Sequence, residues 1–66
     1  MKIILNGEPR EATEGLTIAV LLAQLDFAGR RLAVEVNEDI VPKSRHEGTV
    51  LRDGDRVEIV HAIGGG

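Results

Sequence analysis

The spacing of the apolar residues changes twice along this chain, and this change restricts the fold more than any other feature. The opening residues alternate between apolar and polar positions, as strands do. Ile18, Leu21, Leu22 and Leu25 then fall at i, i+3, i+4 and i+7, which is one face of a helix. Alternation returns after Arg31. A helix of about three turns is not stable alone, so we expect one helix packed on a sheet.

The two ends of the sequence predict how that sheet is ordered. Asn6-Gly7 favours a type I′ turn between an apolar strand over residues 1–5 and a polar return strand over residues 8–12. Pro9 cannot donate a ladder hydrogen bond, which places the return strand at an edge. Residues 56–63 are apolar on both faces towards their end, which is typical of a central strand. We therefore expect the last strand beside the first and parallel to it.

The middle of the chain predicts shorter elements. Residues 32–36 alternate, with Ala33 and Glu35 on the face opposite the larger apolar side chains. Ile40-Val41 is expected to form a short strand, followed by a loop or a single helical turn over residues 43–48. Residues 49–51 are expected to touch the sheet.

These elements predict an α+β fold with a mixed sheet of four or five strands packed on one main helix. Thr17 is expected to cap the start of the helix, and Gly29 to supply the left-handed residue after its end. Residues 1–63 are expected to form the domain, and residues 64–66 a flexible C-terminal glycine tail.

Size and composition exclude several classes of function. A chain of 66 residues forms a single small domain. It has no cysteine, so disulfides, thiolate nucleophiles and thiolate metal sites are absent. A net charge of −3, without a basic run, argues against nucleic-acid binding. The apolar run Ile18–Ala23 is too short to span a membrane. We expect a cytoplasmic protein that is a monomer when free and binds no cofactor permanently.

Few residues could carry catalysis. Ser44, His46 and Glu47 share one polar loop, where a nucleophile and a base could meet, but these are ordinary residues of a solvated loop. His61 is expected to be a half-buried sheet residue near the end of the last strand. The sequence therefore predicts no catalytic residue and no metal site.

The three glycines that follow the last strand are the most unusual feature. They cannot form a phosphate-binding loop, because no helix follows them in the sequence. Without Cβ atoms, such a tail can enter a narrow tunnel and leave its terminal carboxylate unhindered. Ordering these residues costs on the order of 3–6 kcal/mol, so a partner must contact both the tail and the domain. The pattern predicts a protein that presents its own C-terminus as a substrate.

Four stretches together resemble the ThiS-type sulfur carriers of thiamine biosynthesis, small members of the ubiquitin-like β-grasp superfamily. They are "IILNGEP", "TIAVLLAQLD", "LAVEVNEDIVPKS" and "LRDGDRVEIVHAIGGG", and the resemblance runs along essentially the whole chain. The last stretch, with Asp53-Gly54-Asp55, a strand and terminal glycines, is the most specific. The resemblance implies a ubiquitin-like β-grasp fold.

The resemblance also implies a function and its partners. An E1-like adenylating enzyme uses ATP to activate the Gly66 carboxylate, and Gly64 and Gly65 are recognised as the tail. Sulfur from a desulfurase system then produces a thiocarboxylate, and thiazole synthase accepts the sulfur. On this basis the protein is a sulfur carrier rather than an enzyme.

A partner surface is expected on the sheet face that the helix does not cover. Val60, Ala62 and Ala33 should point outward there and, with Ile63, form a modest apolar patch beside the tail. Single exposed apolar residues are also common without any function. Two other functions remain open from the sequence: the small subunit of molybdopterin synthase, and a conjugating modifier or plain interaction module.

Overall fold

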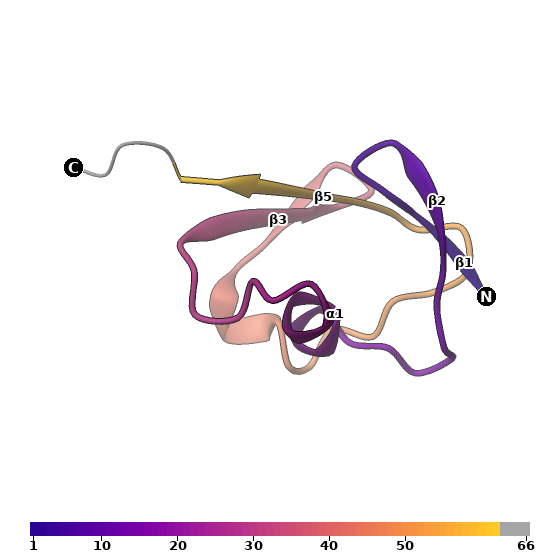
Figure 1. Cartoon of the computed structure of the whole chain (residues 1–66), viewed down its shortest axis with the longest axis horizontal. Helices are drawn as coiled ribbons and strands as arrows, with labels where there is room; N and C mark the ends of the chain where they lie inside the picture. Colours follow the sequence, from indigo (N-terminus) through magenta and orange to yellow (C-terminus); the bar gives the residue numbers. More distant parts are fainter. Residues whose placement is uncertain (63–66) are drawn as a thin grey trace.

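The structure, a computed structural model, describes residues 1–62 and shows one α-helix packed against one face of a mixed sheet (Figure 1). The sheet has five strands in the order β2-β1-β5-β3-β4. The elements are β1 (Lys2–Leu5), β2 (Glu8–Glu11), α1 (Ile18–Gln24), β3 (Leu32–Val36), β4 (Asp39–Val41), the 3₁₀ helix η1 (Lys43–Arg45) and β5 (Arg56–His61).

The last strand occupies the middle of the sheet, as the sequence predicts. β5 pairs with β1 in parallel, with Leu5 opposite Val57, and with β3 in antiparallel fashion, with Val34 opposite Ile59. β2, which contains Pro9, pairs only with β1 and forms one edge. The predicted edge strand and the predicted parallel pair are both confirmed.

The core lies between α1 and the inner face of the sheet. Ile18 and Leu21 of the helix are fully buried, and the predicted helix face therefore points inward. The alternation of β5 is equally clear, since Val57 and Ile59 are buried whereas Glu58 and Val60 are exposed. The other buried apolar residues are Ile3, Leu16, Leu22, Val34 and Leu51.

The start of α1 is as predicted from the sequence, but its end is not. Thr17 caps the helix, because its hydroxyl oxygen accepts a hydrogen bond from the Val20 amide at 3.2 Å. The helix then spans 7 residues, about two turns rather than the predicted three. The left-handed residue that closes the helix is Asp26, with φ of 63°. Gly29 also has a positive φ, of 83°, but lies further along the loop.

Two backbone hydrogen bonds explain this position. The Phe27 amide donates to the Leu22 carbonyl at 2.8 Å, and the Asp26 amide donates to the Ala23 carbonyl at 3.1 Å. This is the pattern of a Schellman motif, which closes a helix around one left-handed residue. An aspartate therefore holds a conformation that glycine adopts more easily.

Asparagine side chains attach two hairpin turns to the central strand. Asn6 and Gly7 both have positive φ, as the predicted type I′ turn requires, and the Asn6 side-chain oxygen accepts a hydrogen bond from the Ile59 amide at 2.8 Å. The Asn37 side-chain oxygen likewise accepts a hydrogen bond from the Arg56 amide at 3.0 Å. Both turns therefore stabilise the strand that leads to the C-terminal residues.

Residues 49–51 do not join the sheet as expected. Val50 instead forms an isolated bridge with Thr17, just before the helix. Leu51 is buried in the core, and its amide donates to the Leu16 carbonyl at 2.8 Å. This segment therefore closes the core at the start of α1.

Candidate functional site

The candidate site is the end of β5, from which the sequence continues into the glycines. The last strand pair joins Leu32 of β3 to His61. The next amide, that of Ala62, donates to the Arg31 carbonyl at 3.0 Å. The backbone is therefore bonded to its neighbour up to the last described residue. Ile63, Gly64, Gly65 and Gly66, which the sequence analysis assigns to the site, lie outside the described residues.

Aromatic contacts attach the end of β5 to the loop after the helix. The ring of His61 meets the ring of Phe27 edge to face, with centroids 4.5 Å apart and planes at 88°. The Arg30 guanidinium carbon lies 5.9 Å from the centre of the same Phe27 ring. His61 is exposed, and not half-buried as predicted, because β5 runs past α1 at this end (Figure 1). The contact between the rings of His61 and Phe27 stabilises the fold by on the order of 1 kcal/mol.

The predicted apolar patch lies on the outer face of the sheet. Val60 is 58% exposed and stands directly opposite Ala33, which is also exposed. Ala62 is exposed one residue beyond the strand. Ile40 of β4 is 72% exposed and stands opposite Glu35. Its exposure was not predicted, because the sequence does not show which face of so short a strand is free.

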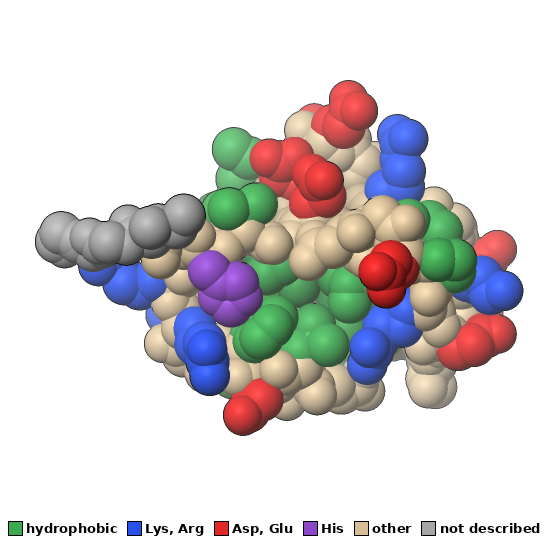
Figure 2. Space-filling model, turned by 45° about the horizontal axis from the view of Figure 1, so that its top comes forward, with side chains coloured by type: hydrophobic (Ala, Val, Ile, Leu, Met, Phe, Trp, Pro, Cys, Tyr) green, Lys and Arg blue, Asp and Glu red, His purple; other side chains and the backbone are tan. Residues whose placement is uncertain are grey.

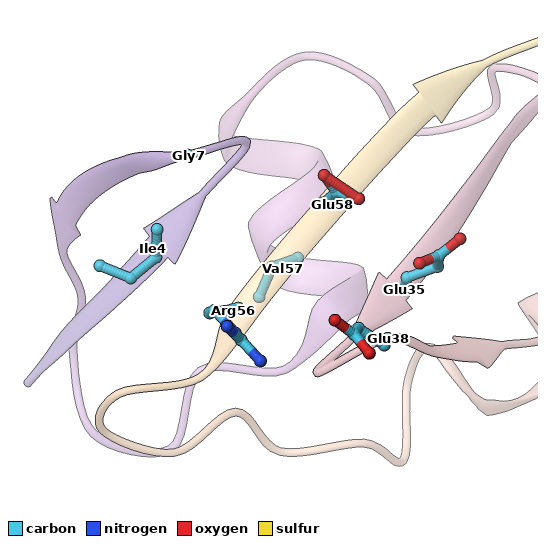
Figure 3. Close-up of a pocket in the computed structure, with 7 residues that line it drawn as sticks. All are labelled: Ile4, Gly7, Glu35, Glu38, Arg56, Val57 and Glu58. Atoms are coloured by element: carbon cyan, nitrogen blue, oxygen red, sulfur yellow. The ribbon is translucent and has the colours of Figure 1, made fainter.

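Two pockets of opposite character lie along β5. The first, of about 190 Å³, surrounds the start of the strand, where Glu35, Glu38 and Glu58 accompany Arg56 (Figure 3). Glu35 and Glu58 are direct cross-strand neighbours on β3 and β5, which is unfavourable for like charges.

The second pocket is open, has a volume of about 450 Å³, and lies at the other end of β5. Its basic side chains come from Arg30, Arg31 and Lys43, next to His61. Figure 2 shows blue Lys and Arg side chains beside a purple His at one end of the molecule, and blue and red side chains mixed over the rest of this face. The pocket at the end of β5 is lined by basic side chains without an acidic one, whereas the pocket at the start of the strand is mainly acidic.

The polar loop shows no catalytic pair. His46 is only 7% exposed, and its Nε2 lies 3.0 Å from the Val41 carbonyl oxygen, to which it donates. The histidine is therefore a buried structural residue, and not part of a solvated loop as expected. Ser44 and Glu47 on either side of it are exposed. The ring acts as a hydrogen-bond donor to β4 rather than as a base.

The described residues also bear on metals and membranes. Within residues 1–62, no three His, Asp or Glu side chains are grouped closely enough to hold a metal ion. In the same part of the chain, no helix has the length and apolar character needed to cross a membrane.

Comparison with protein families and solved structures places this geometry in context. A model described as the ThiS family matches residues 3–66. The crystal structure of a thiamine biosynthesis protein, ThiS, from Geobacter metallireducens superposes with a TM-score of 0.86 and 32% sequence identity over the full length of both chains.

Curated relatives fall into two groups. The sulfur carrier protein ThiS of Escherichia coli is 32% identical over the whole of both chains. A thiazole synthase of Paramagnetospirillum magneticum is 46% identical over all 66 residues, but the chain spans only 20% of the length of that protein. A segment similar to this chain thus also occurs within a longer protein.

Proposed function

The chain belongs to the ThiS family, and we propose that it is a sulfur carrier protein of thiamine biosynthesis that carries the sulfur as a thiocarboxylate on Gly66. The observation that carries this proposal is the position of β5. The strand is central, and its backbone is bonded to the neighbouring segment as far as Ala62. The sequence then passes through Ile63 to the glycines. A firmly held strand can thus present a terminal group to another protein.

The chemistry requires activation because a carboxylate is a poor electrophile. A terminal oxygen of Gly66 attacks the α-phosphorus of ATP, pyrophosphate leaves, and an acyl-adenylate forms. Hydrosulfide then attacks the carbonyl carbon and loses its proton, and AMP departs with the electron pair of the broken C–O bond. The product is a thiocarboxylate, with no net oxidation or reduction. The chain contains no cysteine, so no thiol side chain competes as the sulfur carrier.

The glycines have a separate role in this proposal. Gly64 and Gly65 lack Cβ atoms, so an enzyme can surround their backbone closely and bring its reactive groups up to Gly66. The same freedom makes the tail costly to order, by on the order of 3–6 kcal/mol. Contacts with the domain must offset this cost.

We assign these contacts to the apolar patch of Val60, Ala33, Ala62 and Ile63. Val60→Glu places a charge at its centre and should weaken binding of the adenylating enzyme about tenfold or more. Val20→Glu is the matched control, since Val20 is 49% exposed but lies on α1. Equal affinities of the two variants, measured by isothermal titration calorimetry, would remove the patch from the proposal.

The partners follow from the same chemistry. An E1-like adenylating enzyme supplies ATP-dependent activation, a desulfurase system supplies sulfur, and thiazole synthase accepts it. The similar segment within the Paramagnetospirillum magneticum thiazole synthase supports the last of these partners. The cytoplasm, where ATP is available, is the proposed compartment, and the free protein is proposed to be a monomer without a bound cofactor.

A genetic experiment tests the proposed function. In a strain that lacks its own thiamine sulfur carrier, expression of this chain should restore growth without thiamine. Chains with an alanine appended after Gly66 should not do so. Restoration of molybdoenzyme activity in a strain lacking the molybdopterin synthase small subunit, without restoration of thiamine-free growth, would contradict the assignment.

A further inference from the structure

The basic side chains at the end of β5 form a feature that the proposed function does not use. Arg30, Arg31 and Lys43, named here the basic collar, line the open pocket next to His61 and Val60. The lining of that pocket contains no aspartate or glutamate. We infer that the basic collar docks against a carboxylate-rich rim around the entrance through which thiazole synthase receives the tail. This inference rests on the proposed function, because it assumes that the tail enters that enzyme.

The position of the collar contrasts with the charge of the whole chain. Acidic residues outnumber basic ones by eleven to eight, yet three of the eight basic residues line this one pocket. At the opposite end of β5, the pocket contains Glu35, Glu38 and Glu58 (Figure 3). The chain outside the collar has five basic and eleven acidic residues, so its net charge repels an acidic partner surface that the collar attracts. Such a charge pattern selects the orientation in which the C-terminal end approaches first.

One collar side chain, that of Arg30, is also held in place before any partner binds. The Arg30 guanidinium lies over the Phe27 ring, and the Phe27 backbone is fixed by its hydrogen bond to Leu22. The Arg31 carbonyl accepts the Ala62 amide, which joins the collar directly to the base of the tail. Arg30 therefore loses less side-chain freedom on binding than an unsupported surface cation would lose.

The residues around the basic collar favour a protein surface over a free nucleotide as its binding partner. The basic side chains come from two separated segments around an open pocket, next to the exposed apolar side chains of Val60 and Ala33. No residue from the start of α1 lines the pocket, so it lacks the helix N-terminus that commonly binds phosphate. A mixture of apolar and charged groups on an open surface is typical of protein interfaces.

A charge-reversal experiment tests the inference. The collar variant carries Arg30→Glu, Arg31→Glu and Lys43→Glu. The control variant carries Lys2→Glu, Arg10→Glu and Arg52→Glu, which makes the same change in net charge away from the pocket. Stopped-flow fluorescence measures the rate at which each labelled full-length chain associates with thiazole synthase. Circular dichroism first establishes that all variants are folded, and Arg30→Gln with Arg31→Gln and Lys43→Gln provides a milder variant.

The expected result is specific to the collar. At low ionic strength the collar variant should associate about tenfold to a hundredfold more slowly than the control variant, with the glutamine variant between them. The difference should shrink strongly at about 1 M salt, where charges are screened within roughly 3 Å. Equal rates for the collar and control variants, with normal binding of the original chain, would overturn the inference but leave the proposed function intact.

Two further outcomes would also overturn it. If the original chain does not bind thiazole synthase at all, both the proposed partner and the collar inference fail. If ATP alone, without any protein partner, shifts the amide resonances of the collar residues at millimolar concentration, the pocket is a nucleotide site. Absence of such shifts, together with the slower association of the collar variant, supports a carboxylate-rich protein rim.

Discussion

The Schellman motif at the end of α1 predicts that Asp26→Gly stabilises the protein. Asp26 has φ of 63°, and an L-residue in this region costs about 1–2 kcal/mol relative to its usual conformations. Aspartate lies at the lower end of that range because its side chain can form local hydrogen bonds. Asp26 also places a negative charge just after the negative end of the helix, which costs a further ~0.3 kcal/mol.

Glycine removes both costs but gains freedom in the unfolded chain, which opposes the benefit by about 0.4–1 kcal/mol. The net stabilisation should therefore be about 0.3–0.9 kcal/mol. In a domain of this size, that corresponds to a rise of about 1–7 °C in the thermal midpoint. Circular dichroism at 222 nm (the helix signal) during heating and in urea measures both quantities.

Asp26→Asn is the matched control, because it removes the charge but keeps the side chain. It should gain only the electrostatic part, about 0.3 kcal/mol, and this gain should decrease as salt increases. The advantage of Asp26→Gly over Asp26→Asn should persist in salt. If Asp26→Gly were no more stable than Asp26→Asn, the backbone argument for this helix end would be refuted.

Two further predictions concern residues that position the core elements. Asn6→Gly keeps the positive φ but removes the acceptor of the Ile59 amide hydrogen bond. It should lower the free energy of unfolding, measured in urea, by about 1–3 kcal/mol and accelerate hydrogen exchange at that amide. Unchanged exchange would contradict the assigned hydrogen bond. Thr17→Ala should cost about 1 kcal/mol, whereas Val20→Glu should stabilise the helix by completing a capping box. Opposite signs in thermal unfolding check this pair, and equal signs would contradict it.

The sheet order could be predicted because its signals are strong and local. Pro9 excludes a central position for its strand, and Asn6-Gly7 specifies the turn. Residues 56–63 are apolar on both faces towards their end, and this favours a central position for that strand. The signals of Pro9 and Asn6-Gly7 depend on backbone chemistry that tertiary contacts do not reverse.

The helix end and the buried histidine could not be predicted in the same way. Glycine preference pointed to Gly29, but the contact of Phe27 with the helix fixes the left-handed residue at Asp26. His46 lies in a polar stretch, and only the position of the Val41 carbonyl makes it a buried donor. Both outcomes depend on distances between segments that no local pattern records.

Part of the candidate site could be predicted from the sequence, and part of it could not. The outward positions of Val60 and Ala33 follow from strand alternation and are confirmed. The basic collar was not predicted, because Lys43 is distant in sequence from Arg30 and Arg31 and joins them only through the fold. Surfaces assembled from separate segments therefore require the structure.

The most direct test of the central claim is the intact mass of the chain after incubation with the adenylating enzyme, ATP and sulfide. The chain ending at Gly66 should exchange one terminal oxygen for sulfur, and a variant extended by one alanine after Gly66 should remain unchanged. Conversion of both chains, or a ladder of conjugates joined through lysine, would contradict the claim that the exposed glycine carboxylate carries the sulfur.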